Sequence, residues 1–351
     1  MGRVSIPSDR SSKLVTIRPV GNQAVKEGVA VILRPPILVE GLVKLYGQTR
    51  AVDGLDLRVE QGSVVAVLGP NGAGKTTLIR VLATLARPTA GRAFVAGFDV
   101  AAHPAEVRRH IGITGQSASI DEYLTGRQNL VMVGELSRLP RSDAKWRAGE
   151  LLEKFELTSA ADRPTKTYSG GMRRKLDLAA SLVTQPEVLF LDEPTTGLDP
   201  RARVGMWQLI RDLGKAGTTL LLTTQYLEEA DQLANEIAVV DAGKVIARGT
   251  SDELKTQVGG TVLEVTLPEH ADLAAAAGLL RSLAAAAVSV DERQHRLTMP
   301  FTDEEGLVTK VVRALDAGGV VVDDISVHRP ALDDVFMSLT GHRAELDEAA
   351  A

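Results

Sequence analysis

The chain has 351 residues, a length that allows two domains, and 44% of them are hydrophobic, enough to bury a sizeable core. Only 3% are aromatic and the net charge is -5, so neither a base-stacking platform nor a general nucleic-acid binder is expected. The absence of cysteine excludes disulfides, thiol chemistry and cysteine-based zinc sites.

A membrane-spanning helix is also not expected, because a span needs about 18–20 uninterrupted apolar residues. The nearest candidate is the alanine-rich segment Asp272–Val290. Arg281 and Ser282 interrupt it, so an amphipathic soluble helix is the better interpretation. The basic N-terminus is followed by no apolar stretch with a cleavage site, which argues against a signal peptide. If the protein serves a membrane, we expect it to do so as a peripheral subunit.

Taken in chain order, residues 1–36 are aperiodic and end in Arg34-Pro35-Pro36, so we expect a flexible N-terminal extension. Residues 37–255 alternate short Val/Leu/Ile strands with helical stretches, which predicts an α/β domain with a largely parallel sheet. The continuous apolar runs Val64–Leu68 and Val188–Leu191 are typical of strands that are buried on both faces.

The pattern changes beyond Gly259-Gly260, which we interpret as a joint. The order of elements becomes strand, helix, strand, strand, helix, strand, which is ferredoxin-like. The ranges are Thr261–Leu267, Ala271–Ala284, Val288–Val290, Arg296–Phe301, Asp303–Leu315 and Val320–Val327. The sequence therefore predicts a small α+β C-terminal accessory domain over residues 256–345, followed by a tail at 346–351.

A phosphate-binding loop follows the strand Val64–Leu68 and opens a helix expected at Thr76–Leu85, the order that this motif requires. Its pattern is G-x-x-x-x-G-K-[ST], formed by Gly69, Pro70, Asn71, Gly72, Ala73, Gly74, Lys75 and Thr76, with Thr77 after it. Glycines let backbone N–H groups face the phosphates. Lys75 would bridge the β- and γ-phosphates, and the Thr76 hydroxyl would bind Mg²⁺. GTPases, kinases and helicases share this loop, so it does not by itself select a class.

Two carboxylates, Asp192 and Glu193, directly follow the strand Val188–Leu191. Neighbouring residues on a strand point to opposite faces, but at the end of a strand both can reach a site above the sheet. Asp192 would hold Mg²⁺ through water, and Glu193 would polarise the attacking water. The sequence therefore predicts a nucleoside triphosphatase of the P-loop class.

Shortly before these carboxylates, Tyr168-Ser169-Gly170-Gly171-Met172 opens a helix expected at Met172–Val183 and resembles the LSGGQ signature of ABC transporter ATPases. The resemblance extends over about residues 37–255, with a helical subdomain at about 117–184. It implies that Ser169, Gly170 and Gly171 cap the γ-phosphate of an ATP bound to the other subunit of a dimer.

The other motifs of that family stand in its usual order. Tyr46 matches the A-loop aromatic that stacks on adenine, and Gln116 matches the Q-loop glutamine that reaches Mg²⁺. Thr196–Asp199 matches the D-loop, which places Asp199 at the dimer interface. Gln225 stands where most ABC ATPases have a switch histidine. Since glutamine can donate a hydrogen bond but cannot carry a proton, we expect Glu193 to act as the base and Gln225 as a phosphate sensor.

Tyr168 and Met172, in place of the leucine and glutamine of the signature, depart from the usual ABC pattern as Gln225 does. With the segments around them, these departures resemble the daunorubicin-resistance (DrrA-like) type of drug-exporter ATPase. They include Thr114–Gln116, Leu124–Leu130, Tyr168–Met172, Thr224–Asp231, Leu332–Phe336 and Leu339–Gly341. The resemblance implies a peripheral subunit on the cytoplasmic face of the cell membrane that pairs with a separate multi-span permease. It also implies export of hydrophobic antibiotics such as anthracyclines, and a C-terminal domain that helps assembly.

A single phosphate loop and a single signature per chain imply a homodimer closing head to tail around two ATPs, with Mg²⁺ as the metal. An exporter of lipid or polysaccharide remains an alternative. A soluble ABC ATPase acting on nucleic acid or ribosomes is less favoured, because the chain has one ATPase domain and no cysteine hook. A GTPase would need an Asn-Lys-x-Asp motif, which is absent, and no nucleic-acid partner is expected.

Overall fold

The computed structural model describes residues 35–115, 120–258, 261–268, 270–283, 288–291, 294–300 and 306–328, together with positions 332, 335 and 336. Most of the predicted N-terminal extension, the Gly259-Gly260 joint and the tail at 346–351 lie outside these residues.

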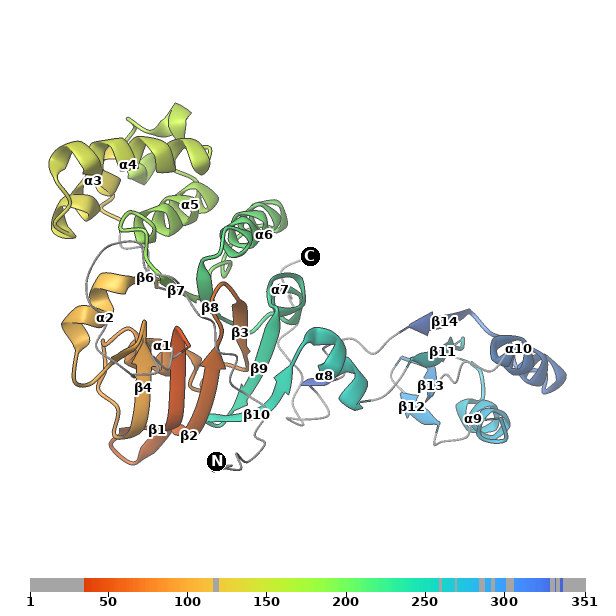
Figure 1. Ribbon diagram of the computed structural model, residues 1–351. Coiled ribbons are helices and arrows are strands. Elements are labelled where there is room, and N and C mark those ends of the chain that lie inside the picture. Colours follow the sequence, from red (N-terminus) through yellow and green to blue (C-terminus); the bar gives the residue numbers. More distant parts are fainter. Residues whose placement is uncertain are drawn as a thin grey trace, which may run out of the picture. The chain divides into compact units, whose positions relative to one another are not determined.

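A six-stranded sheet in the order β10-β9-β3-β8-β7-β6 forms the centre of the first domain (Figure 1). Five strands are parallel, as the apolar runs predict, and β10 pairs antiparallel with β9 at one edge. Every residue of β3 and β7 is buried, because both faces of the sheet are covered. The strands are β3 (Val64–Leu68), β6 (Ile111–Thr114), β7 (Val188–Asp192), β8 (Thr219–Thr224), β9 (Glu236–Asp241) and β10 (Lys244–Gly249).

A second sheet, in the order β2-β1-β4-β5, is antiparallel throughout. The expectation of a largely parallel sheet did not include it. β1 and β2 are joined by the two-residue turn Gly47-Gln48, in which Gly47 has φ 60°. Side chains then alternate along β2, with Leu55, Leu57 and Val59 buried. The strands are β1 (Ile37–Tyr46), β2 (Thr49–Val59), β4 (Ala90–Val95) and β5 (Phe98–Asp99).

The helix after β3, α1 (Lys75–Leu82), contributes Leu78, Ile79 and Leu82 to a cluster with apolar residues of both sheets. It begins one residue before the predicted start and ends three before the predicted end, since Thr84 turns left-handed at φ 63°. Because α1 directly follows the phosphate loop, this packing anchors the end of that loop to both sheets.

The predicted helical subdomain is present, and Figure 1 shows α3, α4 and α5 gathered together beside the six-stranded sheet. Thr125 and Gln128 form a capping box at the start of α3, which explains why this helix begins there. The helices of the domain are α2 (Pro104–His110), α3 (Gly126–Leu136), α4 (Arg141–Lys154), α5 (Gly170–Ser181), α6 (Pro200–Lys215), α7 (Leu227–Leu233) and α8 (Ser251–Val258).

The C-terminal part confirms the ferredoxin-like prediction. Its antiparallel sheet has the order β12-β13-β11-β14, which is the order of strands two, three, one and four of that motif. The core includes Leu263, Leu280, Leu297, Val311 and Leu315. The elements are β11 (Val262–Thr266), α9 (Leu273–Arg281), β12 (Ser289–Asp291), β13 (Arg296–Pro300), α10 (Leu307–Ala317) and β14 (Asp324–His328).

Among the described residues, no helix has the length and apolar character needed to cross a membrane. The segment interpreted as one amphipathic helix, Asp272–Val290, contains the nine-residue α9 and then the start of β12. Further along the chain, Leu332, Val335 and Phe336 are buried and belong to the same hydrophobic cluster as Leu227 and Leu254.

Candidate nucleotide-binding and hydrolytic site

The candidate site lies at the carboxyl ends of β3, β7 and β8 in the six-stranded sheet. This end of the sheet is called the β3–β7–β8 edge below. Leu68 at the end of β3 pairs with Thr224, and Asp192 at the end of β7 pairs with Thr223. Because the strands are parallel, the residues that follow them emerge side by side at this edge. The phosphate loop, the two carboxylates and Gln225 are thus brought together from three separate parts of the chain.

The phosphate loop has a backbone that only glycine permits at two points. A Cβ atom on Gly69 would lie 2.2 Å from the Val240 carbonyl oxygen, and one on Gly74 would lie 2.2 Å from that of Ala51. Gly74 also has φ 103°. A cavity of about 180 Å³ results, lined by Ala51, Asn71, Gly72, Gly74, Lys75, Thr76, Thr77 and Glu193. Its floor is the N-terminus of α1, where backbone N–H groups favour an anion.

Lys75 is 4% exposed, and its ammonium group is directed into the loop. Nζ donates to the carbonyl oxygens of Gly69 at 2.7 Å and Pro70 at 3.0 Å, and it lies 3.7 Å from Glu193 Oε1. Burial lowers the pKa of Lys75, while the charges of Glu193 and Asp192 act in the opposite direction. A buried cation in this position is suited to an anionic ligand.

The two carboxylates, Asp192 and Glu193, lie at the carboxyl end of β7 and have different partners. Asp192 Oδ1 accepts hydrogen bonds from Thr223 Oγ1 at 2.6 Å and Thr76 Oγ1 at 3.2 Å. Glu193 is 7% exposed and has a left-handed backbone with φ 50°, which is uncommon for a residue with a side chain. This conformation ends the strand and turns the Glu193 carboxylate toward Lys75.

Thr76 and Asp192 provide donors that fit the predicted magnesium ion. A hydroxyl oxygen and a carboxylate oxygen lie 3.2 Å apart at the phosphate loop, and Mg²⁺ prefers such hard oxygen ligands beside substrate phosphates. Gln116, the third predicted ligand, lies outside the described residues.

Tyr46 stands at the end of β1 with 46% of its surface exposed. The Lys44 ammonium lies 4.8 Å from the centroid of its ring. A half-exposed aromatic ring leaves a face on which a base can stack. The structure therefore leaves Tyr46 accessible instead of placing it in the core.

The signature segment lies at the start of α5. This helix begins at Gly170, two residues before its predicted start at Met172. Ser169 is the N-cap, and its side chain accepts from the Met172 N–H at 3.2 Å. Ser169 and Gly170 are exposed. Tyr168 is buried, and its hydroxyl donates to the Ala160 carbonyl oxygen at 2.7 Å, which gives this tyrosine a structural role.

Asp199 and Gln225 are the remaining predicted site residues. Asp199 caps α6 and accepts from the Ala202 N–H at 2.8 Å, so its side chain has a bond within its own chain. Gln225 is half-buried directly after β8.

Sequence reasoning missed one buried carboxyl group beside the site, that of Glu229 on α7. Its Oε1 accepts from Thr195 Oγ1 at 2.7 Å and from Trp207 Nε1 at 3.2 Å. Burial raises the pKa of Glu229, against the opposing effect of these hydrogen bonds. The available signal was its position between Leu227 and Ala230, both on the buried face of a short helix.

Comparisons with known proteins identify the class of protein to which the chain is similar. The family model for ABC transporters matches residues 52–196, and the model for the C-terminal domain of ATP-binding proteins of the DrrA1-3 type matches residues 249–340. A solved structure of the ATP-binding subunit of an ABC transporter is similar, with a TM-score of 0.57 and 27% identity. That match covers 63% of this chain and 92% of the other. The class that the fold and the site define is the ABC-type ATPase, as predicted.

Similarity to curated proteins extends over nearly the whole chain. It is 55% identical to the daunorubicin resistance ATP-binding protein DrrA3 of Streptomyces coeruleorubidus, over 90% of this chain and 98% of that protein. It is 40% identical to the Nod factor export ATP-binding protein I of Ralstonia nicotianae, over 88% of this chain and 94% of that protein. The chain therefore belongs to the daunorubicin-resistance (DrrA) family of ABC transporter ATP-binding proteins.

Proposed function

We propose that this chain binds ATP with Mg²⁺ at the β3–β7–β8 edge and hydrolyses it as a homodimer. Hydrolysis would drive export of hydrophobic drugs of the anthracycline kind through a separate multi-span permease. The observation that carries the proposal is that Lys75 and Glu193 line one cavity, while Asp192 accepts a hydrogen bond from Thr76 of the same lining. The chain that holds this site belongs to a family of ABC transporter ATP-binding proteins.

Each residue has a defined task in this proposal. Lys75 neutralises the β- and γ-phosphates, which the backbone N–H groups of the loop also contact. Thr76 and Asp192 would hold Mg²⁺, with Gln116 as a further ligand, and the ion would neutralise charge that develops on the phosphates. Glu193 orients and deprotonates the attacking water.

Three further contacts complete the ATP site. Tyr46 stacks on the adenine ring, and Gln225 donates a hydrogen bond to the γ-phosphate. Ser169, Gly170 and Gly171 serve the ATP of the opposite subunit, a role that the exposure of Ser169 and Gly170 at the start of α5 supports. Asp199, the N-cap residue of α6, lies at the same dimer interface in this proposal.

The chain would divide its work between a nucleotide-binding domain at residues 37–255 and an accessory domain at 256–345 that assists assembly. Association with a permease places the dimer at the cytoplasmic face of the cell membrane. Closure on ATP and reopening after hydrolysis would then move the permease between two states.

The first experiment is purification of the tagged full-length chain from gently solubilised native membranes. We expect a multi-span permease to co-purify in about equal amount. Recovery of ribosomes or nucleic acid in its place, or of no membrane protein, would contradict the transporter assignment.

The cargo is tested in a strain that lacks the gene for this chain. The wild-type gene should restore tolerance to anthracyclines, Lys75→Met should not, and Lys215→Met at the opposite end of the sheet should behave as wild type. A second candidate cargo is a lipid or polysaccharide, and it stays open because one relative is named for Nod factor export and not for drug resistance. Unchanged drug tolerance with intracellular accumulation of such a lipid or sugar would support it.

A further inference from the structure

Arg174, on α5, joins three backbone carbonyl groups that border the site. Its Nε donates to the Pro194 carbonyl oxygen at 2.8 Å and its Nη1 to that of Gly115 at 2.9 Å, while Nη2 donates to that of Glu193. These carbonyls belong to two segments, the one after β6 and the turn after β7. One guanidinium from the helical subdomain therefore connects two loops of the central sheet.

The turn that Arg174 holds includes the residue proposed as the base. Glu193 has a left-handed backbone, a conformation that persists only where the surroundings determine it. Its N–H donates to the carbonyl and hydroxyl oxygens of Thr223, each at 3.1 Å. Its carbonyl group is held from the other side by Arg174. The direction of the Glu193 carboxylate thus depends on bonds at both ends of the residue.

The chemistry of the contact calls for arginine in particular. Its guanidinium is a rigid planar fork that can donate to three separate acceptors at once. A lysine ammonium carries the same charge on a flexible stem and lacks the fixed directions of the fork. Replacement by lysine would keep the positive charge near the carbonyls and loosen their relative positions.

Arg174 also lies on the helix that Ser169 opens. α5 is one continuous helix of 12 residues, and five residues of helix advance by about 7.5 Å, so the signature and Arg174 move together. A displacement of Ser169 by a nucleotide at the partner subunit would be transmitted to the Glu193 turn.

We propose that Arg174 is a positioning residue for hydrolysis that links the signature helix to the general base of its own subunit. The inference rests on the proposed function, since it takes Glu193 as the base and the signature as a contact to the partner's ATP. It assigns a role in coupling the two ATP sites of the dimer to a residue outside the phosphate loop.

The test compares Arg174→Met and Arg174→Lys with the wild-type full-length chain in steady-state ATP hydrolysis. A misplaced base should lower kcat by about 10- to 100-fold and leave KM for ATP within about twofold. We expect Arg174→Lys to retain the thermal unfolding midpoint of the wild type but not its kcat. That separation distinguishes positioning from a merely structural role.

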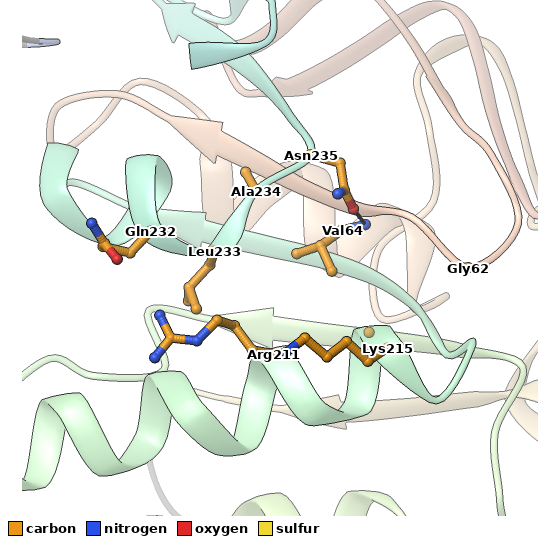
Figure 2. A pocket seen from close by; sticks show the side chains of 9 residues that line it. Gly62, Val64, Arg211, Lys215, Gln232, Leu233, Ala234 and Asn235 are labelled. Carbon is orange, nitrogen blue, oxygen red and sulfur yellow. Dashed lines mark hydrogen bonds between the residues drawn. The ribbon is translucent and has the colours of Figure 1, made fainter. Parts of the chain in front are cut away.

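Arg211 is the matched control, an arginine at the other end of the same sheet. It lines a cavity of about 340 Å³. Figure 2 shows the side chains of this lining, which include Val64 at the start of β3 and Asn235 directly before β9. Arg211 Nη2 donates to Gln208 Oε1 at 3.1 Å. Arg211→Met removes the same charge about one strand length from the site and should leave kcat within about twofold.

The link to the signature is tested by a double variant. If α5 transmits the state of Ser169 through Arg174, then Ser169→Ala combined with Arg174→Met should lose less than the product of the two separate losses in kcat. A full product would overturn the link. Wild-type kcat in Arg174→Met, or an equal loss in Arg211→Met, would overturn the positioning role. Neither result depends on a permease, so failure of the transporter assignment remains distinguishable.

Discussion

The nucleotide-binding edge of the six-stranded sheet and the core of the ferredoxin-like domain differ in the kind of side chain that they bury. The buried ionisable groups at the edge include Lys75, Asp192, Glu193 and Glu229. In the described part of the C-terminal domain, the buried side chains are apolar, as Leu263, Leu280 and Val311 illustrate. Two domains of one chain therefore use burial for different ends.

The difference follows from the cost of burying charge. An ionised group taken out of water destabilises a fold unless it is paired and hydrogen-bonded, whereas each buried apolar side chain stabilises the fold by about 1.5–3 kcal/mol. Under the proposed function, the charges retained at the nucleotide edge serve phosphate binding and proton transfer. The C-terminal domain has an apolar core, whose burial stabilises the fold. Three substitutions test this contrast, beginning with the largest expected effect.

Glu193→Gln should lower the rate of ATP hydrolysis by about 10²–10⁴-fold, because the amide cannot accept the proton of the attacking water. ATP binding should persist, so that the variant accumulates as an ATP-bound dimer in size-exclusion chromatography. Glu187→Gln, at the opposite end of β7, is the control for loss of one carboxylate and should hydrolyse ATP normally. Normal turnover in Glu193→Gln would exclude this residue as the base.

Leu280→Ala should destabilise the C-terminal domain by about 2–5 kcal/mol, since Leu280 is fully buried in that core. The measurement is hydrogen exchange across residues 262–328, combined with ATP hydrolysis by the same protein. Exchange should become faster while kcat stays within about twofold. Val312→Ala, at a 45% exposed position of α10, should leave exchange unchanged. A parallel loss of hydrolysis would show that the two regions are not independent.

Glu229→Gln has the smallest expected effect, and that effect depends on pH. Burial raises the pKa of the Glu229 carboxyl in the folded state. The associated stability is therefore complete below about pH 4.5, the unfolded value, and is lost as pH rises through the folded value. Glutamine keeps an oxygen that can accept from Thr195 and Trp207, and it does not titrate.

The free energy of unfolding of Glu229→Gln should consequently rise relative to wild type as pH increases, by at most about 1.4 kcal/mol per pH unit. Denaturant titrations between pH 5 and 8 measure this difference. Glu228→Gln, an exposed neighbour, is the control for the change in net charge. A difference that is constant over this range would contradict the raised pKa.

Much of the site could be predicted because its residues lie in short contiguous motifs. The strand Val64–Leu68 was predicted with its observed bounds, and the glycines of the loop report the backbone directly. The ferredoxin-like order was predicted because the spacing of apolar residues differs between its strands and its helices. Local sequence carries this information.

Other features depend on contacts between distant segments. The bond between Thr195 and Glu229 joins residues 34 positions apart, and Arg174 contacts a carbonyl 59 positions away. A carbonyl acceptor has no sequence signature, since every residue carries one. The antiparallel β1–β2 pair is a local hairpin, and it was missed for a different reason. Its apolar and polar residues alternate, but they lie within a domain that was interpreted as largely parallel.

The position of β3 in the sheet has a consequence for folding during synthesis on the ribosome. The strand that carries the phosphate loop lies between β8 and β9, and its partner Thr224 follows Leu68 by about 150 residues. At the usual speed of roughly 5–20 residues per second, a ribosome needs about 8–30 s to make that stretch. Until then the loop has no finished sheet behind it. Nucleotide binding is therefore among the last properties that the nascent domain acquires, and ATP cannot assist its early folding.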